Sequence, residues 1–159
     1  MTRTGHHLVG VATGLCVAAG IRHLWPESAW YVAIVAGWFG GVAPDRLEYA
    51  GRYRWVTHRT LTHWGLLWAG LAAWAGWLMS RAIQPNGLVV FLAGFACGGL
   101  SHLLGDWPNP MGVPWWLPTR RRSLNGWLSG QHEMELASCA FGMAWLAWRL
   151  LDPNFLSRL

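Results

Sequence analysis

The chain has 159 residues, of which 53% are hydrophobic and only 12% are charged. An ordinary soluble domain carries roughly 25% charged residues, so this composition argues against a soluble globule and favours one membrane-embedded helical domain over residues 1–159. All 12 basic residues are arginine and the formal net charge is +5. Most of these arginines lie in loops beside apolar segments and no recognition helix is evident, so nucleic-acid binding is not expected.

Five apolar segments predict an all-α, polytopic membrane helix bundle. They are 8–24, 29–43, 64–79, 88–105 and 136–151. Each is near the lower limit of roughly 17 residues for a membrane span, so about five short transmembrane helices are expected. The first segment also has the position of a signal peptide, but four further apolar segments follow and favour a retained helix. Gly94 and Gly98 predict a close helix crossing.

The arginine distribution predicts the orientation. With the amino terminus in the cytoplasm, the inner segments hold eight arginines and the outer ones four at most, as the positive-inside rule requires. The inner set is Arg3, Arg46, Arg52, Arg54, Arg59, Arg120, Arg121 and Arg122, and the outer set is Arg22, Arg81, Arg149 and Arg158. Two large inner loops follow, 44–63 and 106–135, and the Pro- and Trp-rich segment 107–118 is expected along the membrane interface.

Ionisable residues gather where the predicted helices end on the inner side. The inner helix ends hold His6, His7, Asp45, Glu48, His58, His63, His102, Asp106, His132, Glu133 and Glu135. Six of the seven His and five of the seven acids therefore meet at one membrane face. Ionisable groups at this depth are costly and normally pair, bind ions or line a wet cavity, so a divalent metal site is expected there.

The spacing of these residues narrows the ligand set. His102 and Asp106 are four apart on one predicted helix and share a face, whereas His58 and His63 need a loop between them to meet. Mixed imidazole and carboxylate ligands suit zinc best, with manganese or iron as alternatives, as one ion or two. The candidate ligands are His6, His7, Asp45, His58, His63, His102, Asp106, His132 and Glu133.

The motifs in order are Thr4-Gly5-His6-His7, Pro44-Asp45-Arg46-Leu47-Glu48, His58-Arg59-Thr60-Leu61-Thr62-His63 and Ser101-His102-Leu103-Leu104-Gly105-Asp106. With Gly112-Val113-Pro114 and Arg120–Arg122, they resemble the YdjM family of bacterial, membrane-bound, metal-dependent hydrolases. The resemblance implies a multi-pass protein of the bacterial inner membrane, with Asp45, Glu48, Asp106 and Glu133 as catalytic carboxylates. Glu48 stands one position later than the family's usual second aspartate. His6 and His7 both fit the first motif, and Glu135 is an alternative to Glu133.

The resulting hypothesis is a metal-dependent hydrolase that cleaves an ester or phosphoester of a lipid or amphiphile at the cytoplasmic face. Arg59, Arg120, Arg121 and Arg122 would bind phosphate oxygens, although topology and attraction to anionic lipid are the favoured explanation of the triple arginine. The alternative is a non-enzymatic membrane subunit with a structural ion or a partner-binding cluster. A metal or proton carrier is disfavoured because the segment centres hold almost no ionisable residues. The sequence leaves a homo-oligomer or larger membrane complex open.

Overall fold

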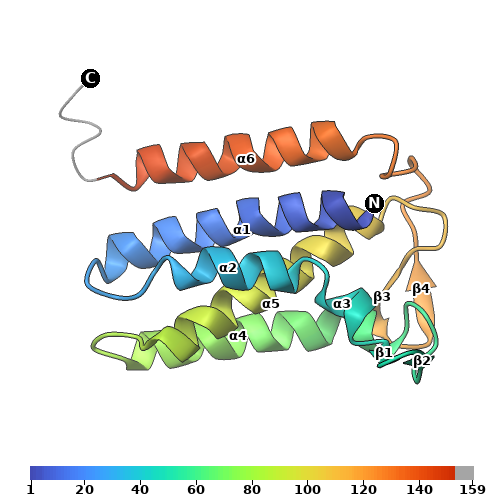
Figure 1. The fold of residues 1–159 in the computed structure, drawn as a ribbon, viewed down its shortest axis with the longest axis horizontal. Helices are drawn as coiled ribbons and strands as arrows, with labels where there is room; N and C mark the ends of the chain where they lie inside the picture. The colour runs from blue at the N-terminus through green and yellow to red at the C-terminus, as the bar shows by residue number, and fades with distance from the viewer. Residues whose placement is uncertain (153–159) are drawn as a thin grey trace.

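The apolar segments form five helices that run up and down along one axis of the molecule (Figure 1). They are α1 (Arg3–Leu24), α2 (Val32–Gly40), α4 (Gly65–Arg81), α5 (Gly87–Asp106) and α6 (Glu133–Leu150). The computed structural model describes residues 1–152, so Arg158 lies outside the described part. Because the helices alternate in direction, the segments 41–64 and 107–132 and the start of α1 lie at the same end.

Local sequence signals account for where the two longest helices begin. The Thr2 hydroxyl accepts from the backbone N–H of Gly5 at the start of α1, and the Asn86 side chain accepts from Val89 at the start of α5. Such caps satisfy N–H groups that have no partner within the helix. These two helices, of 22 and 20 residues, are the ones in the described chain that are long and apolar enough to cross a membrane.

The prediction of five membrane spans is not confirmed. Helix α2 has nine residues and is therefore about 14 Å long, against roughly 30 Å for the hydrocarbon core of a bilayer. It ends early because the chain turns at Gly41 and Val42 before the short helix α3 (Ala43–Arg46) begins. Helix α4, with 17 residues, is also just below the usual length.

Small residues let α2 sit directly against α1 and α5. A Cβ atom added at Gly98 of α5 would lie 2.6 Å from the carbonyl oxygen of Gly37, and one at Gly94 would collide with the carbonyl of Ala33. The backbones are therefore in contact, as the Gly94 and Gly98 spacing predicts. This close packing fixes the end of α5 relative to the α2–α3 turn.

The all-α prediction is wrong for the inner loops, which contain two antiparallel hairpins. Strands β1 (Tyr49–Ala50) and β2 (Tyr53–Arg54) pair across a turn that begins at Gly51, whose φ of 65° favours glycine. Strands β3 (Val113–Leu117) and β4 (Arg120–Arg122) form the second hairpin. The segment predicted to lie flat along the interface is therefore partly a strand. Its β3 strand packs against α4.

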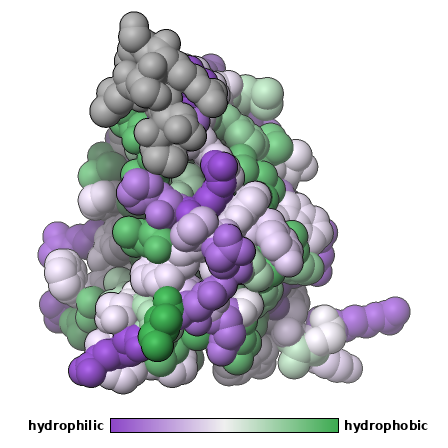
Figure 2. Space-filling view, turned by 90° about the vertical axis from the view of Figure 1, so that its left-hand side faces the viewer, coloured by the Kyte–Doolittle hydropathy of each residue, from purple (hydrophilic) through white to green (hydrophobic). Residues whose placement is uncertain are grey.

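The two ends of the bundle are polar, whereas its flanks expose apolar side chains. Figure 2 shows the end opposite the hairpins, where hydrophilic side chains stand among hydrophobic ones. The loops and helix ends there expose Arg22, His23, Glu27 and Arg81. Between the ends, large side chains such as Trp74 and Trp145 are more than half exposed. This distribution is expected of a protein surrounded by lipid.

Candidate metal centre

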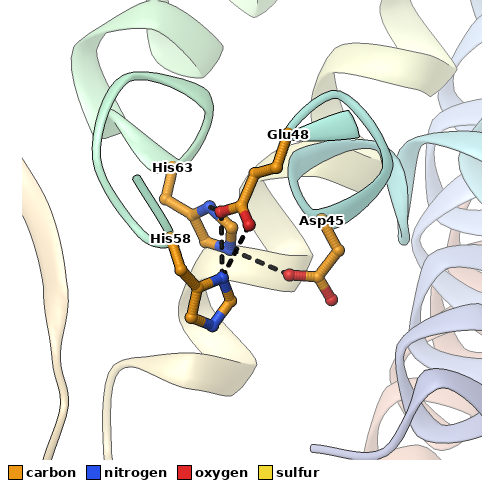
Figure 3. Close-up of side chains that lie close together, drawn as sticks. All are labelled: Asp45, Glu48, His58 and His63. Carbon is orange, nitrogen blue, oxygen red and sulfur yellow. Dashed lines mark hydrogen bonds and ion pairs between the residues drawn. The ribbon is translucent and has the colours of Figure 1, made fainter. Parts of the chain in front are cut away.

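Seven ionisable side chains from separate segments meet at the hairpin end of the bundle. One group consists of Asp45, Glu48, His58 and His63, from α3 and the loop that follows it (Figure 3). A second group consists of His6, His102 and Asp106, from the start of α1 and the end of α5. Within each group, candidate ligand atoms lie within 4.8 Å of one another. Each group is therefore compact enough to surround one metal ion.

Glu48 contacts several members of the first group, and its side chain is buried, with only 1% exposed. Its carboxylate accepts from the backbone N–H of Arg59 at 2.9 Å and from the Thr62 hydroxyl at 3.4 Å. The Nδ1 atoms of His58 and His63 lie 2.8 and 3.2 Å from it. Because an ionised carboxylate only accepts, the Nδ1 of His58 carries the proton and its Nε2 keeps a lone pair. His63 has a carboxylate oxygen at each ring nitrogen, Glu48 at Nδ1 and Asp45 at Nε2, so either nitrogen can carry its proton. Glu48 thus orients two imidazoles.

His102 is held in the same protonation pattern from the other side. Its Nδ1 donates to the carbonyl oxygen of Gly41 at 2.8 Å, so its Nε2 also keeps a lone pair. That Nε2 lies 3.2 Å from Nε2 of His63 and 3.7 Å from a carboxylate oxygen of Asp45 and of Asp106. Asp45 Oδ1 is itself 3.2 Å from His63 Nε2.

When the proton of His63 is on Nδ1, these acceptor atoms face one another without a proton between them. Lone pairs in this arrangement repel unless a cation lies among them. Zinc bonds of about 2.0 to 2.2 Å in a tetrahedral shell separate ligand atoms by roughly 3.3 to 3.6 Å. The distances among His63, His102 and Asp45 match that requirement, so the donor set fits a divalent metal at the junction of the two groups.

Of the two neighbouring histidines in α1, His6 faces the centre. Its ring stacks on that of His102 with centroids 3.7 Å apart, and its Nε2 lies 3.4 Å from Asp106 Oδ1. Nδ1 of His6 is buried and has no hydrogen-bond partner among residues 1–152. His7 turns away, since its ring stacks on Trp38 and its Nδ1 binds the Trp38 carbonyl.

Arg59 lies inside the centre rather than at its surface. Its guanidinium pairs with Asp106 Oδ2 at 2.5 Å and approaches the Gly112 carbonyl at 3.4 Å. The residue is 8% exposed and has a φ of 57°, which is unusual for a side chain of this size. This placement supplies the buried Asp106 carboxylate with a positive charge from the protein itself.

The family comparison agrees with the motifs. The sequence model of the YdjM inner membrane protein family matches residues 1–155. The chain belongs to the YdjM inner membrane protein family. The resemblance deduced from the motifs is thus confirmed, and this YdjM protein is a membrane protein. Neither the curated proteins nor the solved structures include a match to it.

The late acidic segment of this YdjM chain lies outside both groups. Glu133 Oε2 accepts from the backbone N–H and the hydroxyl of Thr2, at 3.1 and 2.6 Å. It thereby ties the start of α6 to the start of α1. The His132 ring contacts that of Trp127 at a tilt of 48°, and the side chains of His132 and Glu135 are 43% and 68% exposed. The structure therefore does not bring His132, Glu133 or Glu135 to the centre.

Several groups that hydrogen-bond to the residues of the YdjM centre were not predicted from the sequence. The Asn109 side chain donates to Asp106 Oδ1 at 3.2 Å. The Trp68 indole donates to the Thr62 carbonyl at 2.7 Å and so holds the turn that precedes His63. The position of Asn109, three residues after Asp106, was an available signal. The Gly41 carbonyl that binds His102 was not visible from the sequence, because backbone groups carry no residue-type pattern.

One side of the YdjM centre is open. Asp45 is 42% exposed and His58 is 33% exposed, whereas the side chains of His63 and His102 are fully buried. Burial raises the pKa of Asp45, but the hydrogen bond from His63 and the nearby imidazole charges outweigh it and hold the pKa at about 2. Asp45 is therefore an anion at neutral pH. A small molecule can reach the centre from this side.

A basic pocket of about 480 Å³ adjoins the open side, between the two hairpins. Its lining includes His58 together with Arg54 of β2 and Arg121 of β4. Arg54 also donates to the Tyr49 hydroxyl and stacks over that ring, which orients its guanidinium. Arg120 and Arg122 flank Arg121 on the exposed β4 strand. Of the arginines expected to bind phosphate, Arg121 therefore lines a pocket beside the centre, whereas Arg59 is buried within it.

Proposed function

We propose that this protein is a membrane-bound, metal-dependent hydrolase that cleaves a phosphoester of a lipid or related amphiphile at the cytoplasmic face. The observation that carries the proposal is the set of possible ligand atoms His63 Nε2, His102 Nε2 and Asp45 Oδ1, which lie close together beside a solvent-exposed edge. A shell that is open on one side leaves room for water or substrate, as catalytic zinc sites do.

A divalent ion held by these ligands would lower the pKa of a bound water and polarise an ester oxygen. The protein's own residues supply the rest. Arg54 and Arg121 would hold two phosphate oxygens in the basic pocket, because guanidinium binds phosphate in a planar, bidentate manner. His58 Nδ1 is held by Glu48, and its far nitrogen points away from the other three side chains (Figure 3). His58 also lines the basic pocket, so this Nε2 can accept a hydrogen bond from a group bound there.

The same proposal includes a membrane topology. Helices α1 and α5 would cross the bilayer, with α4 and α6 as shorter spans and α2 partly inserted beside them. The amino terminus and both hairpins would face the cytoplasm, because most arginines then lie inside. Cysteine accessibility to an impermeant maleimide tests this: a cysteine at Arg121 should react only from the cytoplasmic side, and one at Gln84 only from the outside.

A structural metal site is the second candidate, and the burial of the second group favours it. The side chains of His6, His102 and Asp106 are 3% exposed or less, and Arg59 already neutralises Asp106. An ion fully enclosed by protein would stabilise the fold without reacting. This candidate predicts bound metal and no hydrolysis of any phosphoester or carboxylester.

The test is metal content and hydrolysis on the same purified preparations. Elemental analysis of the detergent-solubilised protein should find a divalent transition metal, and bis(p-nitrophenyl) phosphate should be hydrolysed. His102→Ala and Asp45→Ala should lose both properties. His132→Ala is the matched control, since His132 is exposed and contacts Trp127 away from the centre. Unchanged metal content in both centre variants would overturn the metal site, and bound metal without hydrolysis would favour the structural candidate.

A further inference from the structure

Helix α6 leaves a groove along the bundle because it packs on α1 and makes almost no contact with α5. The groove has a volume of about 410 Å³, with α1 as its floor and α5 and α6 as its walls. Small side chains keep it open, among them Cys16 on α1, Gly105 on α5, and Cys139 and Ala140 on α6. It is distinct from the basic pocket between the hairpins.

One end of the groove reaches the metal centre. Its α5 wall contains Ser101 and Gly105, which immediately precede His102 and Asp106. A Cβ atom at Gly105 would lie 3.8 Å from the Cε1 atom of the His6 ring. The Sδ atom of Met1 would lie closer still, at 2.7 Å, so the absence of a side chain at Gly105 leaves room for the Met1 side chain, which lines this end of the groove beside His6.

The lining presents no free hydrogen-bonding group to an occupant. The Thr13 hydroxyl donates to the Val9 carbonyl at 2.9 Å, and the Ser101 hydroxyl donates to the Gly98 carbonyl at 2.7 Å. The remaining side chains are aliphatic or contain sulfur. An occupant must therefore be apolar, since a polar one would lose its bonds to water without replacement.

The depth and width of the groove indicate what fills it. Helices α1 and α5 are the two that are apolar enough to cross the membrane, so the groove opens at hydrocarbon depth. Its α1 floor runs from Val9 to Cys16, which is roughly 10 Å along a helix. A helix with side chains is about 10 to 12 Å wide, too wide for a groove of this volume and length, whereas a single hydrocarbon chain fits.

We infer that the groove between α5 and α6 binds one acyl chain of the substrate, with the phosphoester at the metal centre and its non-bridging phosphate oxygens directed toward the basic pocket. This inference rests on the proposed function for the position of the head group. It names the substrate class as a phosphate-bearing membrane lipid with at least one acyl chain, in place of a water-soluble phosphoester.

Photo-crosslinking tests chain binding without relying on activity. Phosphatidic acid with a diazirine in one acyl chain is incorporated into phosphatidylcholine vesicles that contain the full-length protein, and the crosslinked residues are mapped by mass spectrometry. Crosslinks should concentrate on the segments around Cys16 and Cys139. Cys97 lies on α5 outside the groove lining and serves as the internal reference. Crosslinks spread evenly around the bundle would show annular lipid only and would overturn the inference.

A bulky side chain in the groove should distinguish acyl-chain binding from the proposed hydrolase function. Ala140→Trp should reduce groove crosslinking and hydrolysis of long-chain phosphatidic acid by about tenfold or more, while metal content and hydrolysis of bis(p-nitrophenyl) phosphate stay unchanged. Ser138→Trp is the matched control, because Ser138 is exposed on the same helix and does not line the groove. Equal crosslinking in Ala140→Trp and wild type would overturn the groove. Groove crosslinking in a protein without metal or hydrolysis would overturn only the proposed function.

Discussion

The two groups of the candidate metal centre contain the same residue types but differ in access and charge. The side chains of His6, His102 and Asp106 are at most 3% exposed, and Arg59 balances the carboxylate. In the group of Asp45, Glu48, His58 and His63, two side chains are a third or more exposed. Its one arginine contact within residues 1–152 at salt-bridge distance is Arg54, 3.7 Å from Glu48 and 46% exposed.

This difference indicates a division of roles. The buried group is held in place by its own internal cation and so resembles part of the structural core. The other group combines the ionised, accessible carboxylate of Asp45 with the accessible imidazole of His58 and is where chemistry can occur. His63 and His102, whose Nε2 atoms are 3.2 Å apart, join the two. Variants that affect one group and spare the other test this division.

The largest effect is expected from Arg59→Met in metal-free protein. Removing Arg59 breaks one buried ion pair and leaves Asp106 with the Met1 ammonium, 3.1 Å from Oδ1, as its remaining fixed cation. The free energy of unfolding should therefore fall by about 3 kcal/mol, the lower end for a buried pair. Denaturant titration in detergent micelles after chelation measures it. Arg54→Met is the matched control, because exposed pairs contribute only about 0 to 1 kcal/mol. Equal effects of the two variants would contradict the division of roles.

The next largest effect is expected from His102→Ala, because Nε2 of this residue faces both groups. Loss of a direct ligand should weaken metal affinity by about a hundredfold or more, since even supporting residues account for 10- to 100-fold. Competition with a fluorescent chelator gives the affinity, and circular dichroism verifies the fold. His7→Ala should leave the affinity unchanged, as His7 contacts Trp38 instead. A strong loss in His7→Ala would reverse the assignment of the two histidines.

Glu48→Gln should have a smaller effect on the same measurement. Glutamine keeps the size of Glu48 but replaces one acceptor oxygen by a donor, so the Nδ1 atoms of His58 and His63 lose a shared anchor. We expect metal affinity to fall by about 10- to 100-fold, the usual range for residues that orient ligands. A loss as large as that of His102→Ala would instead identify Glu48 as a direct ligand.

The smallest effect is expected from mild acidification. Histidine must be neutral to bind metal, so protons compete with the ion and metal affinity should fall as the pH is lowered from 7 to 6. Asp45, with a pKa of about 2, remains ionised throughout this window, so the loss on acidification reports the imidazoles. Metal binding should therefore be complete above the histidine range and lost below it. Retention of metal at pH 4 would point to carboxylate ligands alone.

Much of the bundle could be predicted from the sequence, because each apolar segment contains a helix of the structure. The sequence also predicted that one end of the bundle holds His58, His63, His102 and Asp106, because helices of alternating direction return the chain to the same side. The short length of α2 could not be predicted from the sequence. Its helix ends at the Gly40-Gly41 pair, where close contact with neighbouring backbones outweighs hydropathy.

The orientation of single side chains needed the tertiary structure. His6 and His7 are about 100° apart around α1, and the position of Trp38 decides which one faces inward. Arg59 was predicted to bind phosphate oxygens, but its backbone adopts a positive φ and its guanidinium pairs with Asp106 instead. The hairpin of β3 and β4 was missed because Pro114 and the neighbouring tryptophans suggested an irregular interfacial segment.

Gly41 links helix packing to the geometry of the ligands. A Cβ atom there would collide with the backbone carbonyl of His6, and the carbonyl of Gly41 itself accepts from His102. One residue thus sets how near two histidines from different helices stand to each other. An alanine at this position would push α1 and α2 apart. We expect the affinity for the ion to fall before the fold as a whole is disrupted.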